Sequence, residues 1–212
     1  MLFDLPLDFL VSAFVTLVIV LDPIGLAPTF VAITHGMPRS ARRQVAVRAA
    51  LIAAGVLAGS ALIGDKLLAT VGISLNAFRI AGGLLLFSIA SEMVFGVRIQ
   101  RQSATAEQAL EERVRNIAAF PLAIPLMAGP GAITAMVLLS GRAAGQPALL
   151  AGLIGTAVLV VALCLLTFLA ASRIEKILGI TGNLVLSRLL GVLLAALAVQ
   201  FVVDGVRALL AG

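Results

Sequence analysis

The sequence has few of the residues that cover a water-soluble surface. Only 12% of its 212 residues are charged, whereas 61% are hydrophobic, and a soluble globule needs a more polar composition. Tryptophan and tyrosine are absent, so phenylalanine and flanking charges must replace the usual aromatic belt at a membrane interface. This composition predicts a protein of the lipid bilayer.

Residues that occur only once exclude further classes of protein. The single cysteine, Cys164, cannot pair within the chain, which excludes a disulfide framework. The single histidine, His35, has no neighbouring ligands, so we expect neither a metal site nor a cofactor. The net charge of +5 does not indicate nucleic-acid binding, because lysine and arginine lie at the ends of apolar runs. A cleaved signal peptide is not expected, since Asp4 and Asp8 precede the first apolar run.

Six apolar segments are each long enough to cross a bilayer, which takes about 20 residues of helix. Short turns separate most of them. The sequence therefore predicts an all-α polytopic membrane protein with six transmembrane helices. Their expected ranges are 7–34, 45–68, 73–97, 117–141, 148–172 and 180–210.

The distribution of positive charge predicts the orientation, because connectors rich in lysine and arginine stay cytoplasmic. With the N-terminus outside, the outer side holds Lys66, Arg142 and Arg207. Both termini are therefore predicted to lie on the outer side of the membrane. The inner side then holds the much larger set of Arg39, Arg42, Arg43, Arg48, Arg98, Arg101, Arg113, Arg115, Arg173 and Lys176.

The chain divides at its longest connector, residues 101–116. Thr105 and Gln108 have the spacing of a capping box, and apolar residues then recur at helical spacing. This pattern predicts a short amphipathic helix on the cytoplasmic surface. Its favoured role is to link the two halves of the chain, and docking of a partner is the alternative. The first half is then 1–100 and the second 117–212.

The two halves of the chain share short glycine-containing motifs near the ends of their apolar segments. "GISLN" at Gly72 aligns with "GITGN" at Gly179, and "GVR" at Gly96 aligns with "GVR" at Gly205. Because each half has three crossings, the second copy must lie upside down relative to the first. Such inverted repeats are typical of secondary transporters, whose substrate binds near the midplane between broken helices.

Proline and glycine predict such breaks in the middle of the first and fourth segments, over 22–28 and 129–132. Backbone groups freed there need a polar cavity or a ligand to satisfy them. A zwitterion would do so, with its carboxylate at a half-helix N-terminus and its ammonium near the acid or free carbonyls. Plain proline kinks and a carboxylate that only caps a helix are the alternatives. The expected substrate-binding residues are Asp22, Pro23, Gly25, Pro28, Gly129, Pro130, Gly131 and Thr134.

Two ion pairs between the third and sixth segments are also expected. Arg79 and Asp204 have similar depths near the outer face, and Arg188 and Glu92 near the inner face. Static bridges are favoured over a gate that breaks and remakes them. Small residues at Gly82, Gly83 and Gly191 would let the two helices approach closely.

The motifs "DPIGLAPTF", "FRIAGGLLLF", "PLAIPLMAGPGAIT" and "LLGVLLAALAVQFVVDG" closely resemble the MarC-like family, also called the neutral amino acid transporter family. The resemblance covers nearly the whole chain. It implies an inner-membrane protein with six helices and periplasmic termini, and transport of small neutral amino acids with protons for some members. Leu26 departs from the family's usual asparagine, which leaves more of the recognition to backbone groups.

Secondary transport by alternating access is the expected function, with a small neutral amino acid, H⁺ and the lipid bilayer as partners. A channel, a non-transporting scaffold and an exporter of another metabolite remain alternatives, and a homo-oligomer is compatible with the sequence. An enzyme is not expected. It would require a nucleophile with a base or paired acids at one depth, yet no HExxH motif occurs and "IGDK" at 63–66 lies at a helix end without a second motif acid.

Overall fold

The computed structural model describes residues 6–211, apart from 99, 103 and 105–115. The described part is helical, as predicted. Most of the predicted connector helix at 101–116 lies outside the described residues. The elements are α1 (Pro6–Leu21), α2 (Leu26–Ile33), α3 (Arg39–Thr70), α4 (Leu75–Phe95), the irregular helical segment η1 (Ala118–Met127), α6 (Pro130–Arg142) and α7 (Pro147–Ala211).

Within the described residues, four helical stretches are long and apolar enough to cross a membrane. They are Arg39–Thr70, Leu75–Phe95, Pro147–Ile174 and Thr181–Leu210. The pairs α1 with α2 and η1 with α6 are bent by 46° and 57°, and they raise the number to six if each pair is one span. Helix α3, which corresponds to the second predicted span, begins at Arg39 rather than 45, because hydropathy marks the apolar part of a helix and not its polar first turns.

The long helices bury one face and leave an apolar face outside. On α3, the buried positions recur at helical spacing and include Ala46, Ala53 and Leu57, whereas Leu51 and Leu62 are exposed. Only 33% of the apolar window of α3 is buried inside the protein. An outer surface of this kind is stable only when hydrocarbon covers it.

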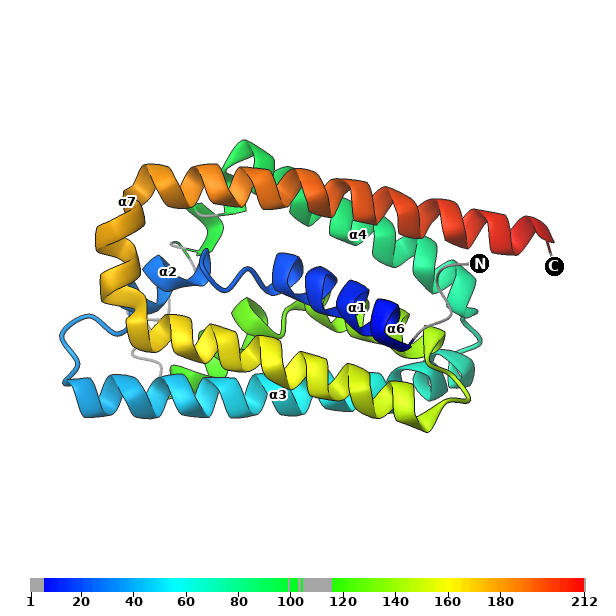
Figure 1. The fold of residues 1–212 in the computed structure, drawn as a ribbon, viewed down its shortest axis with the longest axis horizontal. Coiled ribbons are helices and arrows are strands. Elements are labelled where there is room, and N and C mark those ends of the chain that lie inside the picture. The colour runs from blue at the N-terminus through cyan, green and yellow to red at the C-terminus, as the bar shows by residue number, and fades with distance from the viewer. Residues whose placement is uncertain (1–5, 99, 103, 105–115, 212) are drawn as a thin grey trace.

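Figure 1 shows how the spans are arranged. The two halves of α7 form an antiparallel pair, since the chain turns at Gly179, whose φ is +60°. The first half of α7 lies along α3 and the second along α4, while α1 and α2 lie between these layers. The start of α1 and the end of α7 lie toward one end of the molecule, and α3 begins at the opposite end (Figure 1).

The short helix α6 is the most enclosed element, because almost every residue from Gly131 to Ser140 is buried. Glycines let its neighbours approach it. A Cβ at Gly64 of α3 would lie 2.6 Å from a methyl of Val137, and a Cβ at Gly82 of α4 would overlap the methyl of Thr134. The α6 half of this broken pair therefore packs in the centre of the protein rather than at its lipid surface.

Two of the three predicted small residues lie where α4 packs against the second half of α7. A Cβ at Gly83 would lie 2.8 Å from the carbonyl oxygen of Ala198, and one at Gly191 would lie 3.1 Å from that of Ala90. The third, Gly82, contacts α6 instead. Close backbone approach of this kind is how helices associate in lipid, where burial of apolar surface adds no driving force.

This contact gives a direct prediction for stability. We expect Gly83→Ala to destabilise the protein by about 1–3 kcal/mol, because its Cβ meets backbone that cannot yield and lies 2.7 Å from a Val202 methyl. Gly55→Ala is the matched control, since nothing lies within 4 Å of its Cβ, and it should stabilise α3 by up to about 1 kcal/mol. Thermal unfolding in detergent measures both, and equal shifts would contradict the packing.

Candidate functional site

The first break separates α1 from α2 at residues 22–25. Asp22 has a φ of +52° and its N–H still donates to the Val18 carbonyl, at 2.9 Å. Its buried carboxylate accepts the N–H of Gly25 through Oδ1, at 3.1 Å, and its own carbonyl accepts the N–H of Leu26. The side chain thus caps the start of α2, which is the structural role expected for Asp22 as an alternative to substrate binding.

Glycine is required beside this carboxylate, because a Cβ at position 25 would overlap the Asp22 carboxylate. The predicted unwound region was too long, however. Pro28 lies inside the first turn of α2, where a proline is tolerated because its missing N–H would have no intrahelical partner.

The second break lies between η1 and α6, at Ala128 and Gly129. Pro130 is already the first helical residue of α6, so the prediction of an unwound segment to Ala132 was wrong at its far end. Proline at this position suits a helix start because its φ is preset. The Gly129 carbonyl accepts the N–H of Ile133, whereas no partner for the N–H groups of Gly131 or Ala132 occurs among the described residues.

A cavity of about 330 Å³ opens at this free helix N-terminus. Arg98 contributes its guanidinium, which is 7% exposed and donates to the Val20 carbonyl at 3.1 Å and to the Met93 sulfur at 2.9 Å. Gln102, also 7% exposed, lines the same space. The cavity is lined by Val20, Ile89, Arg98, Arg101, Gln102, Pro125, Leu126, Met127, Gly129, Pro130, Gly131 and Ala132.

The positive end of α6 and a buried guanidinium thus face one space, and both favour an anionic group. Burial lowers the pKa of the Arg98 guanidinium from its ordinary value, whereas the nearby Asp22 carboxylate opposes that shift. An arginine starts from so high a pKa that it keeps its charge at neutral pH. A carboxylate in this cavity would have donors from the α6 backbone and from Arg98.

The structure divides the predicted binding residues instead of gathering them into one pocket. Gly129, Pro130 and Gly131 line the cavity at α6. Asp22 and Pro23 line a different cavity of about 480 Å³, which is mostly apolar and lies against both halves of α7. Two breaks in matching places of the sequence therefore do not imply one shared pocket.

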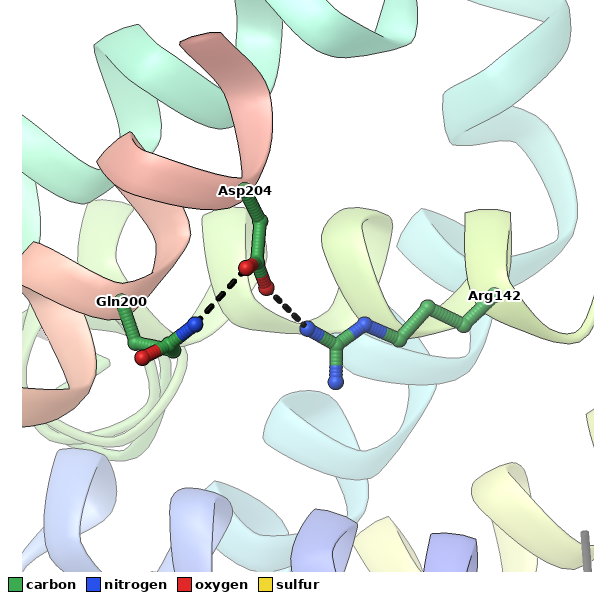
Figure 2. Close-up of polar contacts among 3 residues, drawn as sticks. All are labelled: Arg142, Gln200 and Asp204. Atoms are coloured by element: carbon green, nitrogen blue, oxygen red, sulfur yellow. Dashed lines mark hydrogen bonds and ion pairs between the residues drawn. The ribbon is translucent and has the colours of Figure 1, made fainter. Parts of the chain in front are cut away.

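The ion pairs differ from those predicted. Asp204 accepts from Arg142 at 3.3 Å and from Gln200 at 2.7 Å (Figure 2). Glu92 pairs with Arg101 at 2.7 Å. The predicted pairs of Arg79 with Asp204 and of Arg188 with Glu92 are thus wrong, because residue depth does not specify the direction in which a side chain leaves its helix.

The bridge between Arg142 and Asp204 joins the end of α6 to the second half of α7. The Arg142 guanidinium also lies over the Phe201 ring, 5.4 Å from its centre. Figure 2 shows the three side chains of this network converging from the two helices. This network holds the end of α6 to the second half of α7.

Comparison with known proteins decides the family. The model of the family described as "MarC family integral membrane protein" matches residues 7–210. The chain belongs to the MarC family. A UPF0056 membrane protein of Archaeoglobus fulgidus is 36% identical over 94% of this chain and 92% of its own. The UPF0056 membrane protein YhcE of Escherichia coli is 34% identical, over 99% and 96%.

A further relative, the UPF0056 membrane protein YvbG of Bacillus subtilis, is 33% identical over 94% of this chain and 95% of its own. No solved structure matches. The family model therefore covers nearly all of the described helices. The prediction of a multi-pass integral membrane protein is confirmed at this level.

Arg98 and Gln102 of this MarC-family chain are not among the binding residues predicted from the sequence, because charge distribution alone indicates only that Arg98 is an inner-side charge. One signal pointed to it, namely the repeated "GVR" at Gly96 and Gly205. Gly96 ends α4 with a φ of +78°, and this left-handed residue turns the chain so that Arg98 reaches back into the protein.

Proposed function

We propose that this protein is a secondary transporter of small solutes that carry a carboxylate, with small neutral amino acids as the first candidates. The observation that carries the proposal is the cavity at the start of α6. There, the N–H groups of Gly131 and Ala132 lack partners among the described residues, and the buried Arg98 supplies a positive charge. Hydrogen bonds from such groups to a carboxylate are charge-assisted and short.

The broken pairs support a transport cycle. In the proposal, α1 with α2 and η1 with α6 are the first spans of two inverted three-helix halves, 1–100 and 117–212, and the halves rock against each other. The bends of 46° and 57° provide points at which each span can change shape. Asp22, the acid at the first break, is the residue through which H⁺ would couple to this movement.

Orientation belongs to the same proposal. The arginine-rich start of α3 lies at the end of the molecule opposite the start of α1 and the end of α7 (Figure 1). Because positively charged ends stay cytoplasmic, the proposal is that both termini lie on the periplasmic side of the inner membrane. A reporter fused after Gly212 would read this location, and a cytoplasmic signal would contradict it.

Counterflow in proteoliposomes tests the function. We expect vesicles loaded with unlabelled L-alanine to accumulate labelled L-alanine transiently above its outside concentration, because only a carrier exchanges one molecule for another. L-alaninamide, which lacks the carboxylate, should not compete with the label. Simple equilibration would indicate a channel, and absence of flux with every amino acid would indicate a scaffold.

A further inference from the structure

A third cavity, of about 580 Å³, lies where α3 begins and the first half of α7 ends. Its lining includes five cationic side chains from these two helices, and we call it the basic cavity. Among the described side chains, no carboxylate lines it and none pairs with these groups. The five are Arg39, Arg42, Arg43, Arg173 and Lys176.

Aromatic packing forms the inner wall of the basic cavity. Phe30 of α2 stacks on Phe168 of α7, with ring centres 4.5 Å apart and an angle of 8° between the planes. The Arg42 guanidinium lies 5.7 Å from the centre of the Phe30 ring and donates to the Ser172 hydroxyl at 3.5 Å. Arg42 is thereby held in place.

Four of the five cations have no such anchor. Arg39, Arg43, Arg173 and Lys176 are exposed, and no ion pair involves them among the described residues. Like charges gathered around one space repel each other, and a bound anion with several oxygens relieves that repulsion. The composition of the cavity therefore fits a phosphate group.

The position of the cavity indicates where the phosphate comes from. The apolar span Pro147–Ile174 ends at the cavity, and Leu169 in its wall is 52% exposed. One turn earlier, Leu166 is 61% exposed on the same helix. A lipid lying along these leucines would bring its headgroup to the level of the arginines, because basic pockets at the ends of membrane helices recognise anionic headgroups.

We propose that the basic cavity binds the phosphate of an anionic phospholipid, with its acyl chains along the exposed leucines of α7. This site is separate from the cavity at α6. It goes beyond the proposed transport function and does not depend on it.

Lipid titration of the purified full chain in nonionic detergent, followed by native mass spectrometry, tests the proposal. We expect phosphatidylglycerol to bind at one saturable site and phosphatidylcholine to bind much more weakly. The double variant Arg39→Gln with Arg173→Gln should bind phosphatidylglycerol about 25-fold more weakly, at about fivefold for each charge removed. The charge-retaining pair R39K and R173K should stay close to the parent.

The matched control is the double variant Arg188→Gln with Arg207→Gln, which removes two exposed arginines outside the cavity and should bind like the parent. Equal binding of the two lipids by the parent, or unchanged binding by R39Q with R173Q, would overturn the proposal. Displacement of the lipid by millimolar glycerol phosphate would also overturn it, in favour of a soluble anion at the same arginines. Because the readout is binding, it is independent of transport.

Discussion

Replacement of Arg98 by glutamine should abolish counterflow and weaken amino acid binding by about 10- to 150-fold. The variant loses the cation beside the α6 N-terminus, and a hydrogen bond to a charged group contributes about 1.5–3 kcal/mol. It should also lose about 1–3 kcal/mol of stability, because the buried Val20 carbonyl loses its donor. Counterflow rates, ligand-induced thermal shifts and unfolding midpoints measure these effects.

Two companion variants separate binding from folding. Arg98→Lys keeps the charge, but an ammonium cannot serve both the Val20 carbonyl and a ligand as a guanidinium fork does, so it should fold and transport at an intermediate rate. Arg207→Gln changes the exposed arginine of the matching "GVR" and should leave transport unchanged. If folded R98Q transports like the parent, Arg98 does not take part in substrate binding.

Substitutions at Asp22 should separate its structural role from coupling. Asp22→Ala is expected to lose about 2–3 kcal/mol, since it combines a lost cap with a non-glycine residue at positive φ. Asp22→Asn should keep nearly the full stability, because asparagine caps as well as aspartate and tolerates the left-handed region. Chemical or thermal unfolding of both variants in detergent gives the comparison.

Transport by the Asn variant then identifies the role of the carboxylate. If Asp22 couples H⁺ to transport, exchange survives while uphill accumulation driven by a pH gradient fails, and this is the result that we expect. Loss of exchange together with the ligand-induced thermal shift would instead make Asp22 a substrate ligand. Parent-like behaviour in all assays at several pH values would leave it with the capping role alone.

The breaks show how far local sequence rules extend. Proline and glycine within an apolar run predicted both interruptions, because the missing N–H and the absent Cβ act within a few residues. The same rules placed Pro28 and Gly131 in unwound chain, whereas both lie in first helical turns. A proline within a few residues of a break is equally compatible with the end of one helix and the start of the next.

The candidate site shows where these rules stop. Arg98 belongs to a segment predicted as a cytoplasmic end, yet its guanidinium is buried against the end of α1. Asp22 was expected at the same site as Gly129, but the two line different cavities. Each of these facts depends on how helices are rotated and packed, and a single sequence carries little of that information.

The sequence alone determined the membrane environment, the approximate spans, the two breaks and the end of the molecule at which positive charge collects. Those features depend on hydropathy and on backbone chemistry, which act along the chain. Only the tertiary structure decided that Asp204 pairs with Arg142, that Arg98 faces the N-terminus of α6, and that five cations surround one cavity. These contacts join residues far apart in the sequence, and close packing between helices selects among the partners that depth alone allows.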